Sequence, residues 1–526
     1  MAAAPLTIEL IGELKREVAD DLTHRARRLG CRYADLRLEV VESQFAWAEN
    51  GSCKQSGRDD ALALGIRVIA GDSIAAPGYY GQSLGAADRA RLGRVIRDGL
   101  ARAHARALAN ARGKSASLAA FPDLTAALWD TRLAPVPAGR DTVPAVYDVD
   151  PRSVPLADIV ALANEVGSAL RAMTSVTYSS VGALTQISRE LFVSTEGAVI
   201  DQTFALTQGT CYVVAQEGPV SQELFDCMGH QRGWEVLTRG VEDPPGSPLL
   251  SFPDFRTFAT DLAKDAVALT RATPAPTTDD GVAVVLDPHF TALLAHEIIG
   301  HPTELDRALK METGYAGRSW LLRSLDDTQI GKQVASPLLT AFSDPSLPGF
   351  GHYRYDHEGV PGRRVVHIDR GVFRGFMNSR QTAAIQGGEP NGHCKATDPS
   401  LVPLIRMSNT VFAPGDRDPR DIIQEVDHGY YLVGHKTPSI AESRENFRIS
   451  AMKVYEIWRG ELGQLFRDGG IMADSRAFLM QVDAVGSDFR LIPIPNCGKG
   501  QPMQTKRVGN GGPTLRSRAI LTGGAA

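Results

Sequence analysis

Hydrophobic and polar residues in the first half of the chain follow helical and strand-like periods in turn. Apolar residues recur at helical spacing over residues 7–29 and predict an amphipathic helix. Two strand-like segments flank residues 49–51, whose Glu-Asn-Gly sequence is typical of a tight hairpin. The pattern predicts further helices over 87–112, near 156–172 and over 254–271.

A second β-rich block follows the helix near 156–172. Residues 113–155 hold several prolines and little periodicity, so we expect a long irregular connection there. Residues 187–218 then show a strand, a glycine-containing turn and further strand pattern, like the block around 49–51. A structural duplication accounts for this similarity, and two unrelated hairpins account for it equally well.

The segment 271–281, rich in proline and small polar residues, is typical of a domain linker. A chain of 526 residues is also too long for one hydrophobic core. We therefore predict an α+β protein of two domains. Residues 1–272 form an N-terminal mixed α/β domain, with the duplication as one interpretation. Residues 280–526 form a β-rich C-terminal domain that carries the chemistry described below.

Composition narrows the classes of function. With 43% hydrophobic and 22% charged residues, the chain has the composition of a soluble globular protein. A net charge of −5 gives no general attraction to nucleic acid or to anionic membranes. The sequence shows neither a secretory signal pattern nor an apolar stretch of membrane-spanning length. Six cysteines without a CxxC pair suit a reducing compartment, and we expect a cytoplasmic protein.

The candidate chemistry lies in the stretch HEIIGH at residues 296–301, directly after a strongly marked helix start. Asp287 is a suitable N-cap and Pro288 suits the first helical position. On an ideal helix, however, His296 and His301 would point roughly 140° apart. They could not bind one metal ion if the helix ran straight through both.

The residues around His301 offer ways to bring the two histidines together. Gly300 is a natural helix terminator, and Pro302 disfavours helical backbone at the preceding residue. We therefore expect the helix to end at Gly300, so that His301 turns back beneath His296; a π-bulge is the alternative. Two unrelated histidines flanking a helix end are the remaining interpretation.

Two imidazoles and one further ligand would form a zinc site with an open position for water. Glu297, next to a ligand, is placed to accept the proton of the attacking water and to pass it to the leaving amine. The third ligand is not fixed by this reasoning. Glu304 and Asp306 are near in sequence, while Cys497 and Cys394 lie in glycine-containing segments and offer thiolates.

The chain resembles the TldD/PmbA family of zinc metallopeptidases, in the active type that carries HExxxH. The resemblance implies His296, His301 and Cys497 as zinc ligands and Glu297 as the catalytic acid/base. It also implies cleavage of small or unfolded peptides in an enclosed site, within a homodimer or a heterodimer with a TldE/PmbA-like sister subunit. The stretches that carry it are HEIIGHPTELD (296–306), YDHEGVPGRRVVHIDRGVFRGF (355–376), RMSNT (406–410), NCGKGQPM and VGNGGPTLR (496–516), and, more loosely, ADLRLEVVESQFAWAENG and GIRVIAGD near the N-terminus.

Two positions depart from the pattern of that family. Pro302 replaces a small flexible residue after the second histidine, and His357 replaces an acidic residue before Glu-Gly. We interpret His352 and His357 as structural or substrate-facing, because their spacing places them on opposite faces of a strand.

Two other functions are compatible with parts of the sequence. HEIIGH resembles the HELLGH hexamer of certain dipeptidyl peptidases, although their downstream glutamate motif is missing here. A non-catalytic partner subunit of a TldD/TldE-like complex is the other alternative, which the complete His-Glu-His set disfavours.

Overall fold

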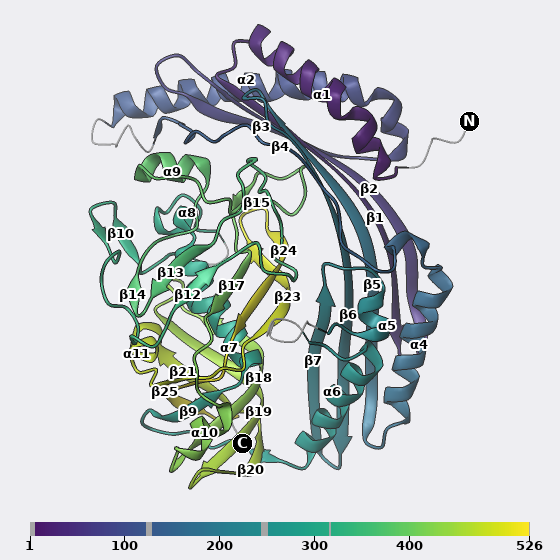
Figure 1. Ribbon diagram of the computed structural model, residues 1–526, viewed down its shortest axis with the longest axis vertical. Helices are drawn as coiled ribbons and strands as arrows, with labels where there is room; N and C mark the ends of the chain where they lie inside the picture. The colour runs from purple at the N-terminus through teal and green to yellow at the C-terminus, as the bar shows by residue number, and fades with distance from the viewer. Residues whose placement is uncertain (1–5, 122–128, 243–250, 315–316, 525–526) are drawn as a thin grey trace.

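The structure is a computed structural model that describes residues 6–121, 129–242, 251–314 and 317–524. Its fold is α+β, as predicted. The first half of the chain contributes one large curved sheet with helices, and the second half contributes two further large sheets with short helices (Figure 1).

The sheet of the first half has seven strands in the order β3-β2-β1-β5-β6-β4, with β7 also paired to β6. All its neighbours are antiparallel except β4, which runs parallel to β6. The strands are β1 (Tyr33–Glu49), β2 (Ser52–Ala70), β3 (Ala76–Leu84), β4 (Arg140–Val143), β5 (Val176–Ser194), β6 (Val199–Glu217) and β7 (Val220–His230). The helices are α1 (Glu9–Arg28), η1 (Ala86–Arg91), α2 (Leu92–Ala120), η2 (Pro151–Ser153), α4 (Leu156–Ala172), α5 (Glu235–Arg239) and α6 (Phe255–Thr270).

The predicted hairpin at residues 49–51 is confirmed. Glu49 pairs with Ser52, and the two turn residues Asn50 and Gly51 have φ values of 49° and 78°. Positive φ at both turn positions matches the right-handed twist of the flanking strands, and Asn-Gly adopts it readily. Gly51 is also required by packing, since a Cβ there would lie 2.0 Å from the hydroxyl oxygen of Ser168 on α4.

The connection predicted over 113–155 is more regular than expected. Helix α2 continues to Ala120, and β4 and η2 follow within the same stretch. The alanine-rich sequence up to residue 120 favours a helix, and the prolines begin only after it. Residues 122–128 lie outside the described residues.

Two large sheets form the second half. The first has the order β14-β13-β12-β17-β24-β23; the second has the order β18-β9-β25-β21-β19-β20-β8, with β22 also paired to β25. The first comprises β12 (Ala341–Ser343), β13 (Val365–Asp369), β14 (Val372–Phe373), β17 (Asn409–Phe412), β23 (Arg490–Lys499) and β24 (Gln504–Gly512). The second comprises β8 (Thr273–Pro274), β9 (Val282–Leu286), β18 (His428–Ile440), β19 (Asn446–Trp458), β20 (Glu461–Arg467), β21 (Gly470–Asp474), β22 (Ala484–Val485) and β25 (Leu515–Thr522).

Short elements complete this half of the chain. Two small hairpins pair β10 with β11 and β15 with β16. They are β10 (Leu322–Ser324), β11 (Asp327–Thr328), β15 (Cys394–Lys395) and β16 (Leu404–Ile405). The helices are α7 (Pro288–Leu294), η3 (Ala295–Gly300), η4 (His301–Thr303), α8 (Leu305–Ala308), α9 (Arg380–Gln386), α10 (Pro419–Gln424) and α11 (Ser475–Met480). Helix α7 contacts β18 of one large sheet and β23 and β24 of the other, so it lies between them.

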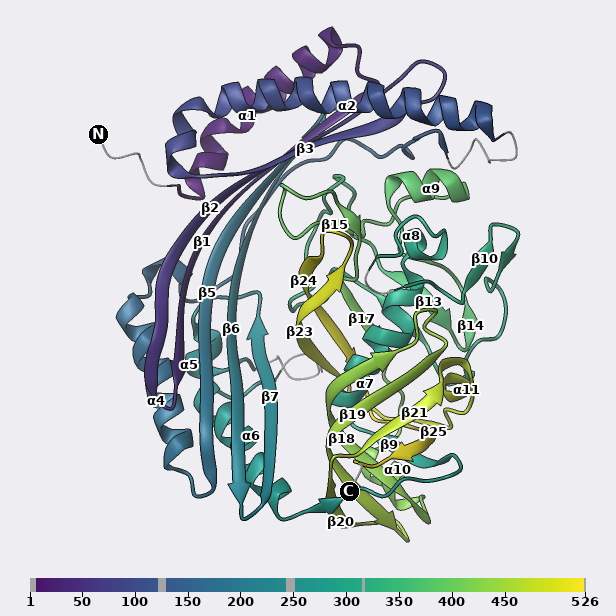
Figure 2. The ribbon, with the colours of Figure 1, turned by 180° about the vertical axis from the view of Figure 1, so that it is seen from behind.

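The two halves pack against each other over a wide area. Helices α1, α2, α4 and α6 cover one face of the curved sheet, and the second half lies against its concave face (Figures 1 and 2). Strand β8, within the segment predicted as a linker, pairs with β20 of the second half. The separate sheets are compatible with domains at 1–272 and 280–526; that division and the duplication stay predictions.

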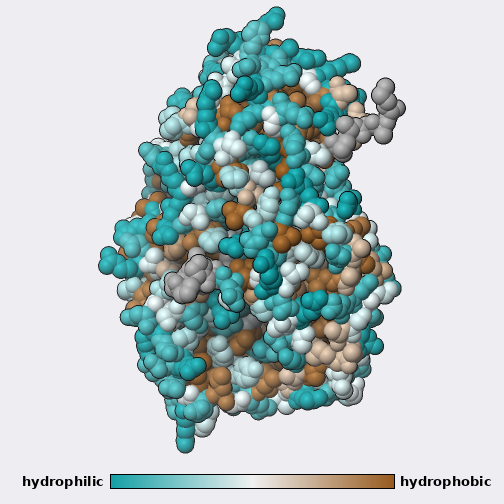
Figure 3. All heavy atoms as spheres, turned by 45° about the vertical axis from the view of Figure 1, so that its right-hand side comes forward, coloured by the Kyte–Doolittle hydropathy of each residue, from teal (hydrophilic) through white to brown (hydrophobic). Residues whose placement is uncertain are grey.

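The length and the hydropathy of the helices bear on whether one could cross a membrane. Among the described residues, none of the helices combines the length and the apolar character needed to cross a bilayer. On the face in Figure 3, hydrophobic residues lie in separate patches between hydrophilic ones.

Candidate metal centre

The helix that carries the two histidines begins as the sequence predicts and then changes its winding. The Asp287 carboxylate accepts a hydrogen bond from the Phe290 N–H at 2.8 Å, and Pro288 occupies the first turn. After Leu294 the backbone widens into a π-helix over Ala295–Gly300, in which the His301 N–H donates to the His296 carbonyl. This hydrogen bond joins residues five apart in sequence, the pattern of a π-helix, and it places His296 and His301 one turn apart on the same side of the helix.

The predicted helix end at Gly300 is therefore wrong, and the alternative of a π-bulge is right. Gly300 (φ −59°, ψ −62°) and His301 (φ −62°, ψ −44°) both keep right-handed helical backbone. Pro302 lies in the first turn of the short 3₁₀ helix η4. A proline has no N–H to donate and clashes with the carbonyl four residues before it, and a widened turn relieves this conflict.

Gly300 is required by packing rather than by backbone conformation. A Cβ at this position would lie 1.9 Å from Sδ of Met407. We expect Gly300→Ala to destabilise the protein by about 1–3 kcal/mol, the usual cost of overpacking a core. Denaturant unfolding followed by circular dichroism measures this change.

The matched control is Gly113→Ala in helix α2, where, apart from the adjoining backbone of the helix itself, no described heavy atom lies within 4 Å of the added Cβ. We expect this variant to be as stable as the parent or more stable by up to about 1 kcal/mol, since alanine favours a helix over glycine. Equal stability of the two alanine variants would contradict the packing role of Gly300.

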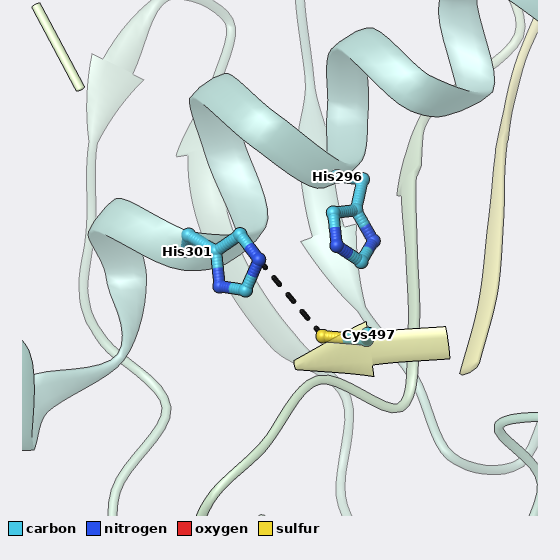
Figure 4. A group of neighbouring side chains, drawn as sticks. All are labelled: His296, His301 and Cys497. Carbon is cyan, nitrogen blue, oxygen red and sulfur yellow. Dashed lines mark hydrogen bonds between the residues drawn. The ribbon is translucent and has the colours of Figure 1, made fainter. Parts of the chain in front are cut away.

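Three candidate ligands come together at the π-helix. One donor atom from each of His296, His301 and Cys497 lies within 4.8 Å of the others. The two rings lie on successive turns with centroids 4.7 Å apart, and Sγ of Cys497 on β23 is 3.9 Å from Nε2 of His301 (Figure 4). All three side chains are buried. The cluster joins residues 196 positions apart in sequence.

Each histidine ring is held by an acceptor on its Nδ1 side. His296 Nδ1 lies 2.9 Å from Oδ1 of Asn510, whose Nδ2 donates to the Thr410 carbonyl. His301 Nδ1 lies 3.2 Å from a carboxylate oxygen of Glu304. Because these oxygens accept, each Nδ1 carries a proton, which leaves Nε2 as the nitrogen available to a metal ion. This tautomer, with an oriented second nitrogen, is the form in which histidine binds metals.

The charges of the cluster suit a cation. Burial raises the pKa of the Cys497 thiol, but His296, His301 and Arg406 outweigh this effect and hold the pKa well below its ordinary value. Burial lowers the pKa of His296, yet Cys497 and the neighbouring groups raise it to about 9. The thiolate thus stabilises positive charge at the rings, whether a proton or a metal ion supplies it. Two imidazoles and a thiolate are also a donor set that zinc accepts.

Glu297 lies beside this cluster and is kept ionised. Burial raises its pKa, but His296, Arg444 and His301 lower it below the ordinary value of a glutamate. A guanidinium nitrogen of Arg444, in the turn between β18 and β19, donates to the Glu297 carboxylate. The arginine therefore both fixes the position of the carboxylate and favours its charged form.

The other candidates for the third ligand have different partners. Glu304 accepts from Nε of Arg307 at 2.6 Å and lies 3.3 Å from the Lys499 ammonium, in addition to its contact with His301. Asp306 pairs with Lys499 at 2.7 Å. Cys394 is buried elsewhere, where its N–H donates to Asp356 at 3.0 Å. The structure thus places Glu304 behind a candidate ligand and Cys394 outside the cluster.

His357 contacts the first half of the chain. Its Nδ1 accepts from the Ala396 N–H at 3.0 Å and lies 2.9 Å from a guanidinium nitrogen of Arg37, while Nε2 lies 3.2 Å from Glu190. Burial is the main cause that lowers the pKa of His357 well below its ordinary value, and the nearby Lys395 lowers it further. His352 bonds the Pro345 carbonyl at 2.9 Å. His357 therefore fastens its loop to strands β1 and β5, in keeping with a structural interpretation.

Sequence reasoning missed the residues that hold the cluster in place. Asn510 lies in strand β24 within a Gly-Asn-Gly-Gly sequence, and Arg444 lies in the turn between β18 and β19. Lys499, two residues after Cys497, is fully buried against Glu304 and Asp306. A lysine in a short Cys-Gly-Lys sequence gives no sign of such burial.

Comparison with known proteins places the chain in a family. Residues 149–272 match the PmbA/TldA metallopeptidase central domain, and residues 279–524 match the PmbA/TldA metallopeptidase C-terminal domain. TldE from Thermococcus kodakarensis has a solved structure with a TM-score of 0.65 at 16% identity, over 95% of this chain and 99% of that one. At this identity the similarity shows the fold alone.

Two relatives match over most of their length. A metalloprotease from Methanothermobacter thermautotrophicus is 30% identical over 374 residues, 71% of this chain and 76% of that protein. A zinc metalloprotease TldD homolog from Saccharolobus solfataricus is 26% identical over 395 residues, 74% of this chain and 80% of that protein. Together with the two domain matches, these similarities show that the chain belongs to the TldD/PmbA family of metallopeptidases.

Proposed function

We propose that this chain is a zinc-dependent peptidase that hydrolyses peptide bonds in small or unfolded peptides. The observation that carries the proposal is the buried cluster of two imidazoles and one thiolate, with Glu297 beside it. The name of the Saccharolobus solfataricus relative, a zinc metalloprotease, supports the choice of metal.

His296, His301 and Cys497 are the proposed ligands. Zinc, when bound there, would supply a Lewis acid that polarises a carbonyl group and lowers the pKa of water toward ~7. Asn510 and Glu304 hold the two rings so that each Nε2 faces the cluster. The thiolate would offset part of the metal charge, and Arg406 donates to the backbone carbonyl of Cys497.

Glu297 is the proposed general base. Its ionised carboxylate can accept the proton of the attacking water and then donate it to the leaving amine. Arg444 orients the carboxylate during both transfers. Burial of Glu297, which is 8% exposed, limits exchange of that proton with bulk solvent.

The structure favours this mechanism over the two alternatives. A HELLGH-type site would need a carboxylate as its third ligand. Among the described residues, the group of side chains placed to bind a metal ion has a cysteine in that position. A non-catalytic subunit has no need of an ionised Glu297 held between the histidines and Arg444. Both alternatives remain outcomes of the experiment below.

The proposal also covers the partner subunit, the way in which the peptide binds and the cellular compartment. We expect the chain to form a homodimer or a heterodimer with a TldE/PmbA-like sister subunit. A peptide substrate could bind by addition to an edge of the β-rich second half. All six cysteines are unpaired, which fits a reducing cytoplasm.

Metal analysis and peptide cleavage test the proposed function together. The purified chain should hold about one zinc ion and should cleave unstructured peptides. A chelator should remove both the metal and the activity, and added zinc should restore them. A metal-free chain that binds no added zinc, or cleavage that resists the chelator, would contradict the proposal.

Replacing Asn510 should weaken metal binding without removing a ligand. In Asn510→Ala the His296 ring loses its acceptor, so we expect zinc affinity to fall by about 10- to 100-fold. Competition with a chromogenic chelator measures this change. Asn510→Asp keeps an acceptor oxygen for the His296 ring but loses the donor to the Thr410 carbonyl, so the two variants together separate the contributions of these contacts. Equal affinity in the alanine variant and the parent would show that Asn510 does not orient the ligand.

A further inference from the structure

A cavity of about 540 Å³ lies near the candidate metal centre, since its lining residue Arg307 contacts Glu304, which contacts His301. Its walls come from α8, the segment around β10, the turn between β18 and β19, and the start of α11. The volume suffices for one or two amino-acid side chains.

The buried wall of this cavity holds an arginine with unused donors. The Arg307 side chain is 0% exposed, and only its Nε is bonded, to Glu304 at 2.6 Å. Nη1 and Nη2 of Arg307, together with the indole nitrogen of Trp320, are buried without a hydrogen-bond partner among the described residues. Buried donors are almost always satisfied in native proteins, so unpaired ones at a cavity wall indicate a missing acceptor.

The rim of the cavity adds positive charge. Lys310, Arg318, Arg323 and Arg476 line it, and none of them forms an ion pair with a described residue. The two acidic residues of the lining, Glu445 and Asp474, accept hydrogen bonds from Ser443 and from the Ala477 N–H. Five cationic side chains against two carboxylates leave an excess of positive charge around the cavity.

The cavity is connected to the proposed catalytic residues along two short routes. Arg307 bonds Glu304, which in turn bonds the His301 ring. Ser443, another lining residue, directly precedes Arg444, which holds Glu297. A ligand in this cavity would therefore lie beside the groups that the proposed function assigns to catalysis.

We propose that this cavity binds a carboxylate of the peptide substrate, carried by an acidic side chain or by the C-terminus. The inference rests on the proposed function and names its substrate class, peptides with an acidic group near the cleaved bond. The two free Nη donors of Arg307 match the two oxygens of a carboxylate, and the Trp320 indole offers a third donor beside an apolar surface. The exposed cations at the rim attract such peptides from solution.

Calorimetric titration of the full-length, zinc-loaded chain tests the proposal. The chain carries Glu297→Gln so that the peptide stays intact. The probes are short unstructured peptides in which one glutamate is moved along the sequence, each paired with its glutamine counterpart. A second set compares a free C-terminal carboxylate with a C-terminal amide. We expect the best acidic peptide to bind about tenfold more tightly than its neutral counterpart.

Variants at the rim separate this cavity from general electrostatics. Arg318→Ala/Arg323→Ala should bring the ratio between acidic and neutral peptides close to one. Arg307→Lys should also reduce it, because a lysine keeps the charge but loses the fork of donors. The matched control removes two exposed arginines of helix α2, Arg97 and Arg112, which form no ion pair with a described residue. It should leave the ratio unchanged.

Several results would overturn the assignment. Equal binding of acidic and neutral peptides in both sets would do so, as would a preference that survives the rim variant or falls equally in the control. Binding of inorganic phosphate without a preference among peptides would indicate a site for a free anion instead. Chelator-sensitive cleavage by the wild type is measured separately, so failure of the cavity proposal leaves the proposed peptidase function intact.

Discussion

Replacing Glu297 with glutamine is expected to lower kcat/KM for peptide cleavage by about 10²- to 10⁴-fold, the usual contribution of a general acid/base. Glutamine has the shape of glutamate and can still accept a hydrogen bond from Arg444, but it cannot take a proton from water at neutral pH. The three proposed ligands are untouched, so zinc content should stay at that of the wild type. Metal analysis and initial rates on the same preparation measure both quantities.

The control for this prediction is Glu389→Gln. The Glu389 side chain is 84% exposed and pairs with Arg363 at 2.9 Å, away from the candidate metal centre. The Glu389→Gln substitution removes the same charge as Glu297→Gln, and it should change neither the zinc content nor the rate of cleavage. Undiminished turnover in Glu297→Gln with zinc present would refute the assigned role. Loss of zinc in that variant would instead show that Glu297 helps to bind the metal.

Local sequence signals predicted the start of the helix that carries the two histidines, and they predicted the first hairpin, because short-range chemistry determines both. Asp287 and Pro288 act on the first turn of α7, and Asn50 and Gly51 meet the φ requirement of a two-residue turn. The α+β class also follows from short-range periodicity, since helical and strand patterns occupy separate segments along the chain.

The winding of the helix through His301 could not be predicted with the same certainty. Gly300 and Pro302 are compatible both with a helix end and with a π-bulge, and the choice depends on distant residues. Met407 packs against Gly300, and Asn510 and Cys497 meet the two rings from β24 and β23. Tertiary contacts of this kind decide between local conformations that differ little in energy.

The sequence did not predict the buried cationic side chains around the candidate metal centre, for a related reason. Buried Lys499, Arg307 and Arg406 are read from sequence as ordinary surface residues, because such side chains are rarely buried without partners. Lys499 and Arg406 are buried because they pair with groups far away in the chain: Lys499 with the Asp306 carboxylate, and Arg406 with the Cys497 carbonyl. Arg307 pairs with Glu304, three residues before it. Long-range pairing of charges leaves no periodic pattern that a single sequence displays.

Removing the thiolate of Cys497 is expected to have the largest effect on metal content. In Cys497→Ala the cluster keeps two neutral imidazoles and loses its only anionic donor among the three. Changing a residue that only orients a ligand lowers metal affinity by about 10- to 100-fold. Losing the ligand itself should lower zinc affinity by more than this. The purified variant should be nearly free of zinc, as should His301→Ala, and chelator competition measures the remaining affinity.

Cys394→Ala is the matched control, since it removes a second buried cysteine from the same half of the chain but lies outside the cluster. It should retain zinc. Full retention of zinc in Cys497→Ala would require a carboxylate as the third ligand. Glu304 would then have to leave Arg307 and Lys499, and Asp306 would have to leave Lys499. Moving Glu304 would leave the buried Arg307 without its carboxylate, and moving Asp306 would leave the buried Lys499 with only the longer contact to Glu304 at 3.3 Å. Because breaking a buried ion pair is costly, we expect that no carboxylate replaces the thiolate.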